Sequence, residues 1–173
     1  LGVDDFKSKL TGGGARANLF KATVNFPSYV ATSDVELTSF LCKGVQIPSS
    51  TIAPIAIPFR GRQLQMAGDR TFEPLSLTII NDSNFTVRNA FESWANGINN
   101  FADNTGVTNA ADFQTDLFVE QLDRDDTILK TYIFRNAFPT SVGQIDLTNE
   151  ETTTIETFEV SWRYQHFEPS SVL

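Results

Sequence analysis

Residues 59–94 read FRGRQLQMAGDRTFEPLSLTIINDSNFTVRNAFESW, and three kinds of local pattern follow one another in this stretch. A turn sequence at residues 60–62 interrupts an apolar run. Residues 75–79 then alternate Leu and Ile with Ser and Thr, which is typical of a strand with one buried face. Large apolar residues recur at spacings of four, three and four over residues 87–98, which predicts an amphipathic helix. The stretch therefore predicts the end of a hairpin, a strand and a helix.

The predicted helix has candidate signals at both ends. Asp82 or Ser83 can accept a hydrogen bond from a free N–H group of the first turn. Gly97 can end the helix in a left-handed conformation, with Ile98 as the apolar contact beyond it. The face that we expect to pack against a sheet consists of Val87, Phe91, Trp94 and Ile98.

Residues 49–70 predict a long hairpin with its tip near residues 60–62. Pro54 and Pro58 cannot donate hydrogen bonds to a neighbouring strand, so the first arm cannot be an ordinary central strand. We therefore expect the hairpin to reach out to a neighbouring subunit rather than lie in the core of its own. Its candidate inter-subunit residues are Ile55, Ile57, Phe59, Arg60, Arg62, Leu64 and Met66.

The rest of the chain predicts further strands. Residues 20–26 alternate apolar and polar side chains, and residues 37–47 predict a second strand of mixed pattern. Residues 115–122 and 128–135 predict two strands joined by an Asp-rich turn, and residues 158–164 show the clearest alternation. Many strands and one helix favour a mainly β fold: an antiparallel sandwich or barrel-like domain with one packed α-helix and a long extended hairpin.

The chain of 173 residues suits a single domain preceded by an arm. Residues 1–18 predict a flexible N-terminal arm, because Gly12–Gly14 would end any helix that starts at Val3. The single domain is expected to span residues 19–173. Residues 99–114 are rich in Asn, Asp, Gly and Thr and predict a loop.

Charge and composition restrict the function. The net charge is −8, whereas a protein that binds nucleic acid tightly needs a basic face, so a DNA-binding module is not expected. A negative wall would instead keep passing DNA from sticking. The single cysteine, Cys42, excludes an intrachain disulfide. No apolar run approaches the length of a membrane span, so we expect no membrane anchor.

No group of residues favours an enzyme. His166, the only histidine, is predicted to lie at the inward phase of the last strand and could serve Cys42 as a base only if the fold joined them. A packed or hydrogen-bonded histidine is the expected role. Residues 123–126 carry three Asp but lack the spacing of a calcium-binding loop, so they predict a solvated turn. We therefore expect no catalytic residue, no cofactor and no metal site.

Residues 59–94 resemble the tail tube proteins of contractile-tailed phages. In that family a hairpin arm leads into an Ala-Gly-Asp-Arg-Thr-Phe motif, then a strand that ends near Asn-Asp, then a helix with a Phe and Trp pair. Here the motif is residues 67–72, the strand end is Asn81-Asp82, and the pair is Phe91 and Trp94. Further matches are Asn18-Leu19-Phe20, FPTSVGQIDL at residues 138–147, and Thr157-Phe158-Glu159-Val160.

The resemblance implies a structural virion protein with the tail-tube fold, assembled in the cytoplasm of the bacterial host. Six copies would form a ring, and rings would stack into a hollow tail tube through which DNA passes after sheath contraction, without specific binding. The implied partners are other copies of the chain, the tail sheath protein, the baseplate and tail-terminator proteins, and a tape measure protein in the lumen. Asp116 and Glu120 are candidates to face the lumen, with Leu117 and Val119 facing the core.

Two other functions fit the same residues. The inner tube protein of a phage-derived contractile injection system would share the fold and deliver protein cargo. A soluble ligand-binding β-sandwich belongs to a different class, and it predicts a stable monomer with a concave aromatic site.

Overall fold

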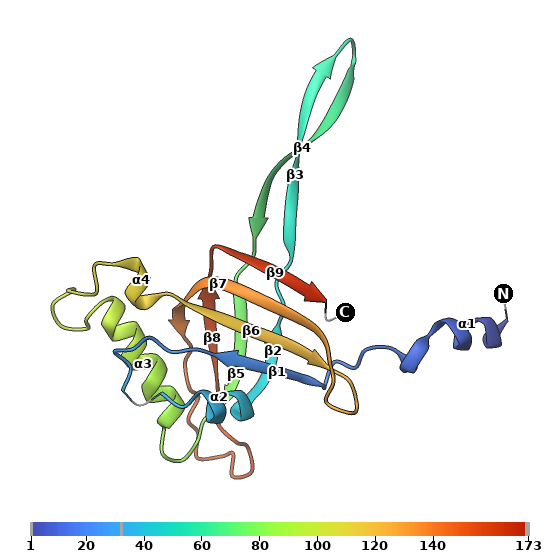
Figure 1. The fold of residues 1–173 in the computed structure, drawn as a ribbon. Coiled ribbons are helices and arrows are strands. Elements are labelled where there is room, and N and C mark those ends of the chain that lie inside the picture. Colours follow the sequence, from blue (N-terminus) through green and yellow to red (C-terminus); the bar gives the residue numbers. More distant parts are fainter. Residues whose placement is uncertain (1, 32, 172–173) are drawn as a thin grey trace.

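The computed structural model describes residues 2–31 and 33–171, which form a curled sheet, a projecting hairpin and several helices (Figure 1). The strands are β1 (Phe20–Val24), β2 (Cys42–Gln46), β3 (Ser50–Phe59), β4 (Arg62–Phe72), β5 (Leu75–Ile80), β6 (Thr115–Leu122), β7 (Ile128–Val142), β8 (Thr157–Arg163) and β9 (His166–Ser171). The helices are α1 (Val3–Lys9), α2 (Val35–Leu41), α3 (Thr86–Ile98) and α4 (Ala110–Phe113), with a 3-10 turn η1 (Thr11–Gly13).

Seven strands form one sheet with the order β1-β6-β7-β8-β5-β2, and β9 pairs with β7 outside that path. The strands β3 and β4 pair only with each other. All of these pairs are antiparallel. The predicted mainly β, antiparallel fold is therefore confirmed.

Strand β7 divides the sheet into two layers because it is long enough to belong to both. Its first part pairs with β6 and β9, and its last part pairs with β8. Asn136 lies at the change of partner and has a φ of 53°, in the left-handed region, and the register with β6 shifts nearby. The chain bends there, so that the β1-β6-β7-β9 layer packs against the β7-β8-β5-β2 layer.

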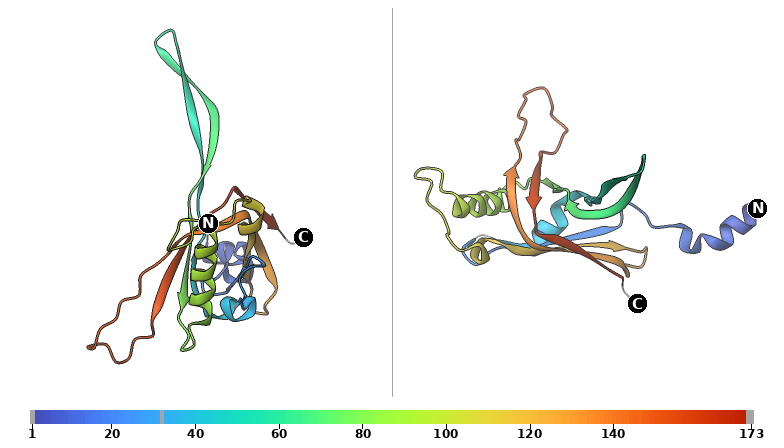
Figure 2. Two further views of the ribbon diagram at one scale, coloured as in Figure 1. Left: turned by 90° about the vertical axis from the view of Figure 1, so that its left-hand side faces the viewer. Right: turned by 90° about the horizontal axis from the view of Figure 1, so that it is seen from above.

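The core lies between these layers and under α3 (Figures 1 and 2). Alternation puts Leu75, Leu77 and Ile79 of β5 on the core side, and all three are buried. Helix α3 contributes Phe91 and Trp94, whose exposed fractions are both 0%. The predicted strand at residues 75–79 and the predicted apolar face of the helix are thus confirmed.

The predictions for the two ends of α3 were wrong. The N-cap residue is Phe85, with a left-handed φ of 56° and no side-chain cap, and Asp82 contributes only its carbonyl, which accepts a hydrogen bond from the Phe85 N–H at 2.9 Å. Gly97 lies inside the helix, whose last residue is Ile98 and whose C-cap is Asn99. A glycine is needed there because a Cβ would overlap the ring of Tyr29.

The predicted strand over residues 37–47 was wrong in its first half, which forms α2. The Asp34 carboxylate accepts a hydrogen bond from the Leu37 N–H at 2.9 Å and so caps this helix. The Thr38 hydroxyl donates to the Asp34 carbonyl at 2.6 Å, and Thr38 is buried. The strand begins only at Cys42.

The N-terminal arm contains α1, which has no buried residue. The helix starts at Val3 and ends at Lys9, ahead of Gly12–Gly14, whose φ values of 70°, 79° and 82° are left-handed. Figure 1 shows the arm projecting away from the sheet. Among residues 2–31 and 33–171, no helix is both long and apolar enough to span a bilayer.

Candidate functional site

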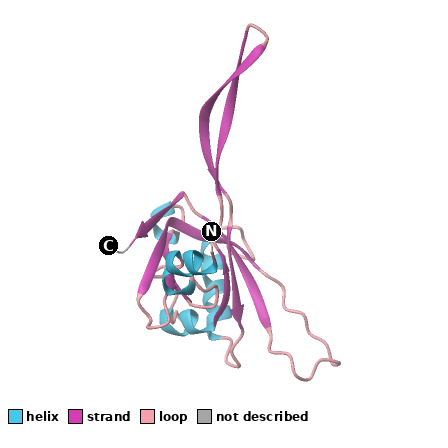
Figure 3. Cartoon of the chain, turned by 90° about the vertical axis from the view of Figure 1, so that its right-hand side faces the viewer, coloured by secondary structure: helices cyan, strands magenta, loops and turns pink. Residues whose placement is uncertain are grey.

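The hairpin β3–β4 is the most prominent surface feature, and it stands clear of the rest of the subunit (Figure 3). Arg60 and Gly61 form its tip, with φ values of 47° and 81°. The two strands pair from Ser50 opposite Phe72 to Phe59 opposite Arg62, with one register shift between Ile52 and Pro54. The predicted hairpin and its tip are therefore confirmed.

One face of the hairpin is apolar and open to solvent. The register places Ile55 opposite Met66 and Ile57 opposite Leu64, so these side chains project from the same face. Their exposed fractions are 52%, 52%, 42% and 58%, and that of Phe59 is 66%. A contiguous exposed apolar surface of this kind usually marks an interaction site. We call it the hairpin face; it consists of Ile55, Ile57, Phe59, Leu64 and Met66.

The two arginines at the tip flank the hairpin face. The Arg60 guanidinium lies 5.3 Å from the centre of the Phe59 ring. Within residues 2–31 and 33–171, neither Arg60 nor Arg62 lies within ion-pair distance of a carboxylate. Both cations are thus available to carboxylates of another molecule.

The second candidate surface is the outer side of the β1-β6-β7-β9 layer. Leu117 and Val119 are buried in the core, as predicted, with exposed fractions of 1% and 3%. Asp116 and Glu120 alternate with them and therefore lie on the opposite side of β6. We call this side the outer face of the layer.

An ion-pair cluster centred on Arg135 joins part of the charge on the outer face. Arg135 of β7 contacts Asp116 at 2.6 Å and Glu168 of β9 at 3.5 Å. The hydrogen bond to Asp116 raises the pKa of the Arg135 guanidinium above its usual value. Lys21 of β1 lies directly opposite Glu120 in the register. The face therefore combines three carboxylates with two cations.

His166 is not at an inward position, so that prediction was wrong. It opens a separate strand, β9, opposite Arg135, and its side chain is 46% exposed. Its Nε2 lies 3.1 Å from Glu168 Oε1, and β9 is separated from Cys42 by three strands of the sheet path. Burial raises the pKa of the Cys42 thiol to about 11, which disfavours a reactive thiolate. The structure does not bring these two residues together.

The acidic turn between β6 and β7 makes only local contacts. The Asp123 carbonyl accepts a hydrogen bond from the Asp126 N–H at 3.1 Å, and the Asp125 carboxylate accepts hydrogen bonds from Thr127. These bonds hold the pKa of Asp125 below its usual value. Across the described ranges, no group of three or more His, Cys, Asp or Glu side chains is arranged to hold a metal ion.

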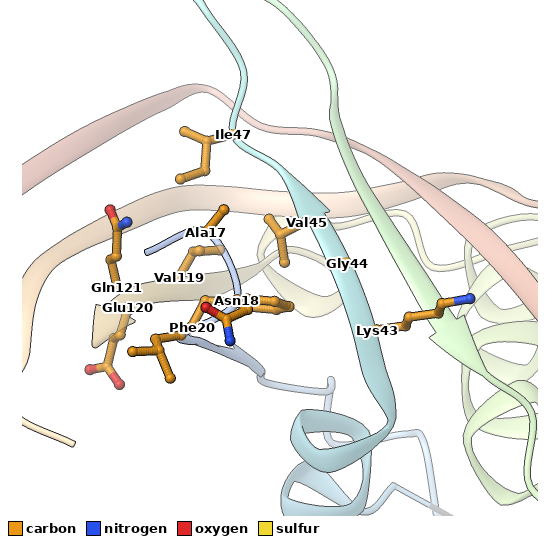
Figure 4. Close-up of a pocket in the computed structure, with 11 residues that line it drawn as sticks. Ala17, Asn18, Phe20, Lys43, Gly44, Val45, Ile47, Val119, Glu120 and Gln121 are labelled. Atoms are coloured by element: carbon orange, nitrogen blue, oxygen red, sulfur yellow. The ribbon is translucent and has the colours of Figure 1, made fainter. Parts of the chain in front are cut away.

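A third feature is a groove where the sheet fails to close. The strands β1 and β2 are the two ends of the sheet path and face each other without pairing. The groove between them has a volume of about 590 Å³ (Figure 4). Figure 4 shows the side chains of Glu120 and Gln121 pointing in opposite directions, with Gln121 on the side of Ile47. Sequence patterns did not predict this groove, because it depends on how far the sheet curls.

Comparisons with known proteins agree with the fold. Residues 10–170 match the family model described as "Phage tail tube protein". The tail tube protein of Serratia phage KSP90 is 30% identical over 165 residues, covering 94% of this chain and 93% of that protein. The tail tube protein gp19 of Enterobacteria phage T4 is 28% identical over 168 residues, covering 96% of this chain and 99% of that protein.

Solved structures show the same fold at low sequence identity. The sheath/tube terminator of an extracellular contractile injection system, PVC, superposes with a TM-score of 0.66 and 14% identity over 91% of this chain and 97% of that one. A chain of the PVC sheath–tube complex superposes with a TM-score of 0.62 and 14% identity over 99% of both chains.

The family match and the curated relatives each extend over nearly the whole chain. The chain belongs to the phage tail tube protein family, the structural tube proteins of contractile bacteriophage tails.

Proposed function

We propose that six copies of this chain form a ring and that the rings stack into the hollow inner tube of a phage tail. The observation that carries this proposal is the hairpin face, which is apolar and has no cover within its own subunit. In a ring or stack the hairpin lies on an adjacent copy, where its apolar side chains are removed from water and Arg60 and Arg62 meet carboxylates. Permanent assemblies use large apolar contacts of this kind.

The strand edges supply a second reason for ring closure. In the described part of the chain, β1 pairs only with β6, and β9 pairs only with β7. Both outer edges of the β1-β6-β7-β9 layer therefore carry backbone groups without a strand partner. Free edges promote uncontrolled association, and closing the layers of several copies into one continuous wall removes them.

The outer face of this layer then lines the bore, with Asp116 and Glu120 exposed to it. In each copy this face has one more carboxylate than it has cations. The carboxylates are Asp116, Glu120 and Glu168, and the cations are Lys21 and Arg135. Such a wall repels phosphate weakly and offers no array of free cations to bind it. The genome, and before it a tape measure protein, can pass without being trapped.

The tube acts with other tail proteins rather than alone. Chains similar in fold come from a sheath–tube complex, a baseplate and a tube-terminating cap of contractile injection systems. These relationships support contacts of this chain with a tail sheath, a baseplate and a terminator protein. Sheath contraction would drive the tube into the host envelope, and the chain itself would carry out no catalysis.

Delivery of protein cargo by an injection system is the second candidate, favoured by those same similarities in fold. The curated relatives at 30% and 28% identity are phage proteins, whereas the injection-system chains are 14–16% identical. The closer sequence relationship favours the phage tail. Capsid and packaging genes beside the gene would support a phage tail, and toxin genes would support the injection system.

Negative-stain electron microscopy of the purified chain at high concentration tests the proposal. Rings or hollow filaments are expected, because the hairpin face and the strand edges find partners in other copies. A monodisperse monomer at every concentration would contradict the proposal and would favour the ligand-binding β-sandwich.

A further inference from the structure

The groove between β1 and β2 offers an apolar surface without an occupant. Its floor is formed by Phe20, Val45 and Val119, and Ile47 at its rim is 43% exposed. A neighbouring hollow of about 730 Å³ shares Asn18, Phe20 and Lys43 and extends the groove toward α2. We call the two together the β1–β2 groove. It is long and open. Its charged lining is mixed: Lys43 lines both parts, Glu120 lines the first, and Lys21 and Glu36 line the second.

The arm of the same chain carries an apolar surface of matching character. Val3 and Phe6 share one face of α1, and Leu10, the C-cap residue, follows at a spacing of four. They are 71%, 65% and 44% exposed, and α1 has no buried residue. Asp4 and Asp5 in its first turn give this end of the helix negative charge.

A helix of this length needs a partner. Isolated helices shorter than about 12–15 residues are marginal in water, and α1 has seven residues. The left-handed φ values at Gly12–Gly14 direct the helix away from its own sheet (Figure 2). The apolar face of α1 is therefore presented to another molecule rather than to the groove of its own subunit.

We propose that α1 of one copy docks into the β1–β2 groove of a second copy. Val3, Phe6 and Leu10 pack on the apolar floor of the groove, and the acidic first turn lies near Lys43 and away from Glu36 and Glu120. The proposal rests on the proposed function in one respect, because the two copies must be neighbours in the assembly. It names a contact separate from the hairpin face, and it gives the arm a function.

The contact is heterologous: the surface that donates differs from the surface that accepts. Each copy therefore has one α1 to donate and one groove to fill, so the contact can repeat from copy to copy along a stack. Two copies can form this contact without being related by a twofold axis. A mixture of two differently substituted proteins can therefore detect the contact between donor and acceptor.

Site-specific cross-linking tests the contact. One protein carries Phe6→Cys and the other carries Ile47→Cys, both in a Cys42→Ala background so that each has a single thiol, and the two carry tags of different size. They are mixed under assembly conditions and treated with a short bismaleimide. The matched control replaces Ile47→Cys by Leu147→Cys, an 84% exposed position in the loop between β7 and β8.

A heterodimer between Phe6→Cys and Ile47→Cys is expected at least about tenfold above the control, because docking holds the two thiols at an effective concentration on the order of millimolar. Introducing Leu10→Asp into the Phe6→Cys protein should lower this yield to that of the control, whereas introducing Ser8→Asp, on the opposite face of α1, should leave it unchanged. Without either change, a yield of the Phe6→Cys and Ile47→Cys pair equal to that of the control would overturn the proposal.

Two further results separate this proposal from the tube function. If electron microscopy shows tubes but the cross-link does not form, the docking of α1 is wrong and the proposed tube function is unaffected. Cross-linked heterodimers without rings would support the docking and contradict the tube. If instead a single chain with both Phe6→Cys and Ile47→Cys cross-links internally and the mixture does not, α1 folds back onto its own subunit and the proposal is wrong.

Discussion

Trp94 connects three parts of the subunit through one side chain. Its ring packs edge-on against Trp162 of β8, with 5.1 Å between ring centres, and in a tilted arrangement against Phe26, with 5.6 Å between ring centres. Its indole N–H donates a hydrogen bond to the Phe113 carbonyl at 2.9 Å, at the end of α4. The residue therefore joins α3 to the sheet and to the segment that leads into β6.

Trp94→Ala is expected to lower the free energy of unfolding by about 3–5 kcal/mol, because it leaves a cavity in a closely packed aromatic cluster. Denaturant unfolding of the dissociated subunit, followed by circular dichroism, measures this. Phe101→Ala is the control, since Phe101 is 81% exposed and its loss should change the free energy by less than about 0.5 kcal/mol. Equal midpoints for Trp94→Ala and the parent would show that α3 does not hold the core.

Gly97→Ala is expected to destabilise the subunit even though alanine favours helices by about 1 kcal/mol over glycine. The new methyl group would overlap the ring of Tyr29, whose hydroxyl donates to the Trp94 carbonyl at 3.0 Å and so cannot move freely. Overpacking costs about 1–3 kcal/mol, so the net effect is a loss. Gly44→Ala, where the nearest atom is 3.9 Å away, is the control for thermal melts. A higher melting temperature for Gly97→Ala would contradict this packing.

Single residues differ in how far the sequence predicts their roles. Phe91 and Trp94 were predictable because their spacing repeats within one helix. The need for Gly97 was not, because it arises from Tyr29, which is distant in the chain and reaches the helix only through the fold. His166 was misplaced for a related reason: the strand was assumed to continue past Tyr164, whereas the chain turns and starts β9.

The hairpin is the element whose sequence and structure agree most closely. Its prolines, its tip and its apolar face are all local features, so the sequence alone predicts them. Strand β2 and helix α2 show the reverse case. Leu37 and Leu41 fit a strand or a helix over so short a range, and the Asp34 cap was the signal that distinguishes them.

Replacing Ile57 and Phe59 together by Asp is expected to leave a folded subunit that no longer assembles, because each contact would bury two unpaired charges. Both side chains are exposed in the subunit, so its own core is unaffected. Circular dichroism and light scattering report the fold and the assembly separately.

The matched control for this variant is Ala56→Asp with Gln65→Asp. These residues pair with each other on the opposite face of the same hairpin, so the charge added is equal and the face differs. Normal tubes from the Ile57 and Phe59 variant would contradict an inter-subunit role for the hairpin face. Loss of fold would instead assign the hairpin to the core of its own subunit.

For the whole molecule, the near balance of charge on the outer face of the layer predicts weak contact with DNA. Glu120→Lys would change the net charge of the outer face from negative to positive in every copy, and a ring repeats this change in each of its subunits. Tubes of this variant should retain double-stranded DNA in a salt-dependent manner, while parental tubes should not, because added cations release counterions from the phosphates. Glu150→Lys, in the exposed loop between β7 and β8, is the control. Equal retention by parent and variant would show that the outer face does not line the bore.

The proposed function requires that copies of this chain close into rings whose bore is lined by the outer face of the β1-β6-β7-β9 layer. A cryo-electron microscopy reconstruction of tubes assembled from the purified chain tests it most directly. We expect stacked sixfold rings, with Asp116 and Glu120 facing an open bore and the hairpin face covered by an adjacent copy. Tubes whose bore is lined by another surface, or with an uncovered hairpin face, would contradict it.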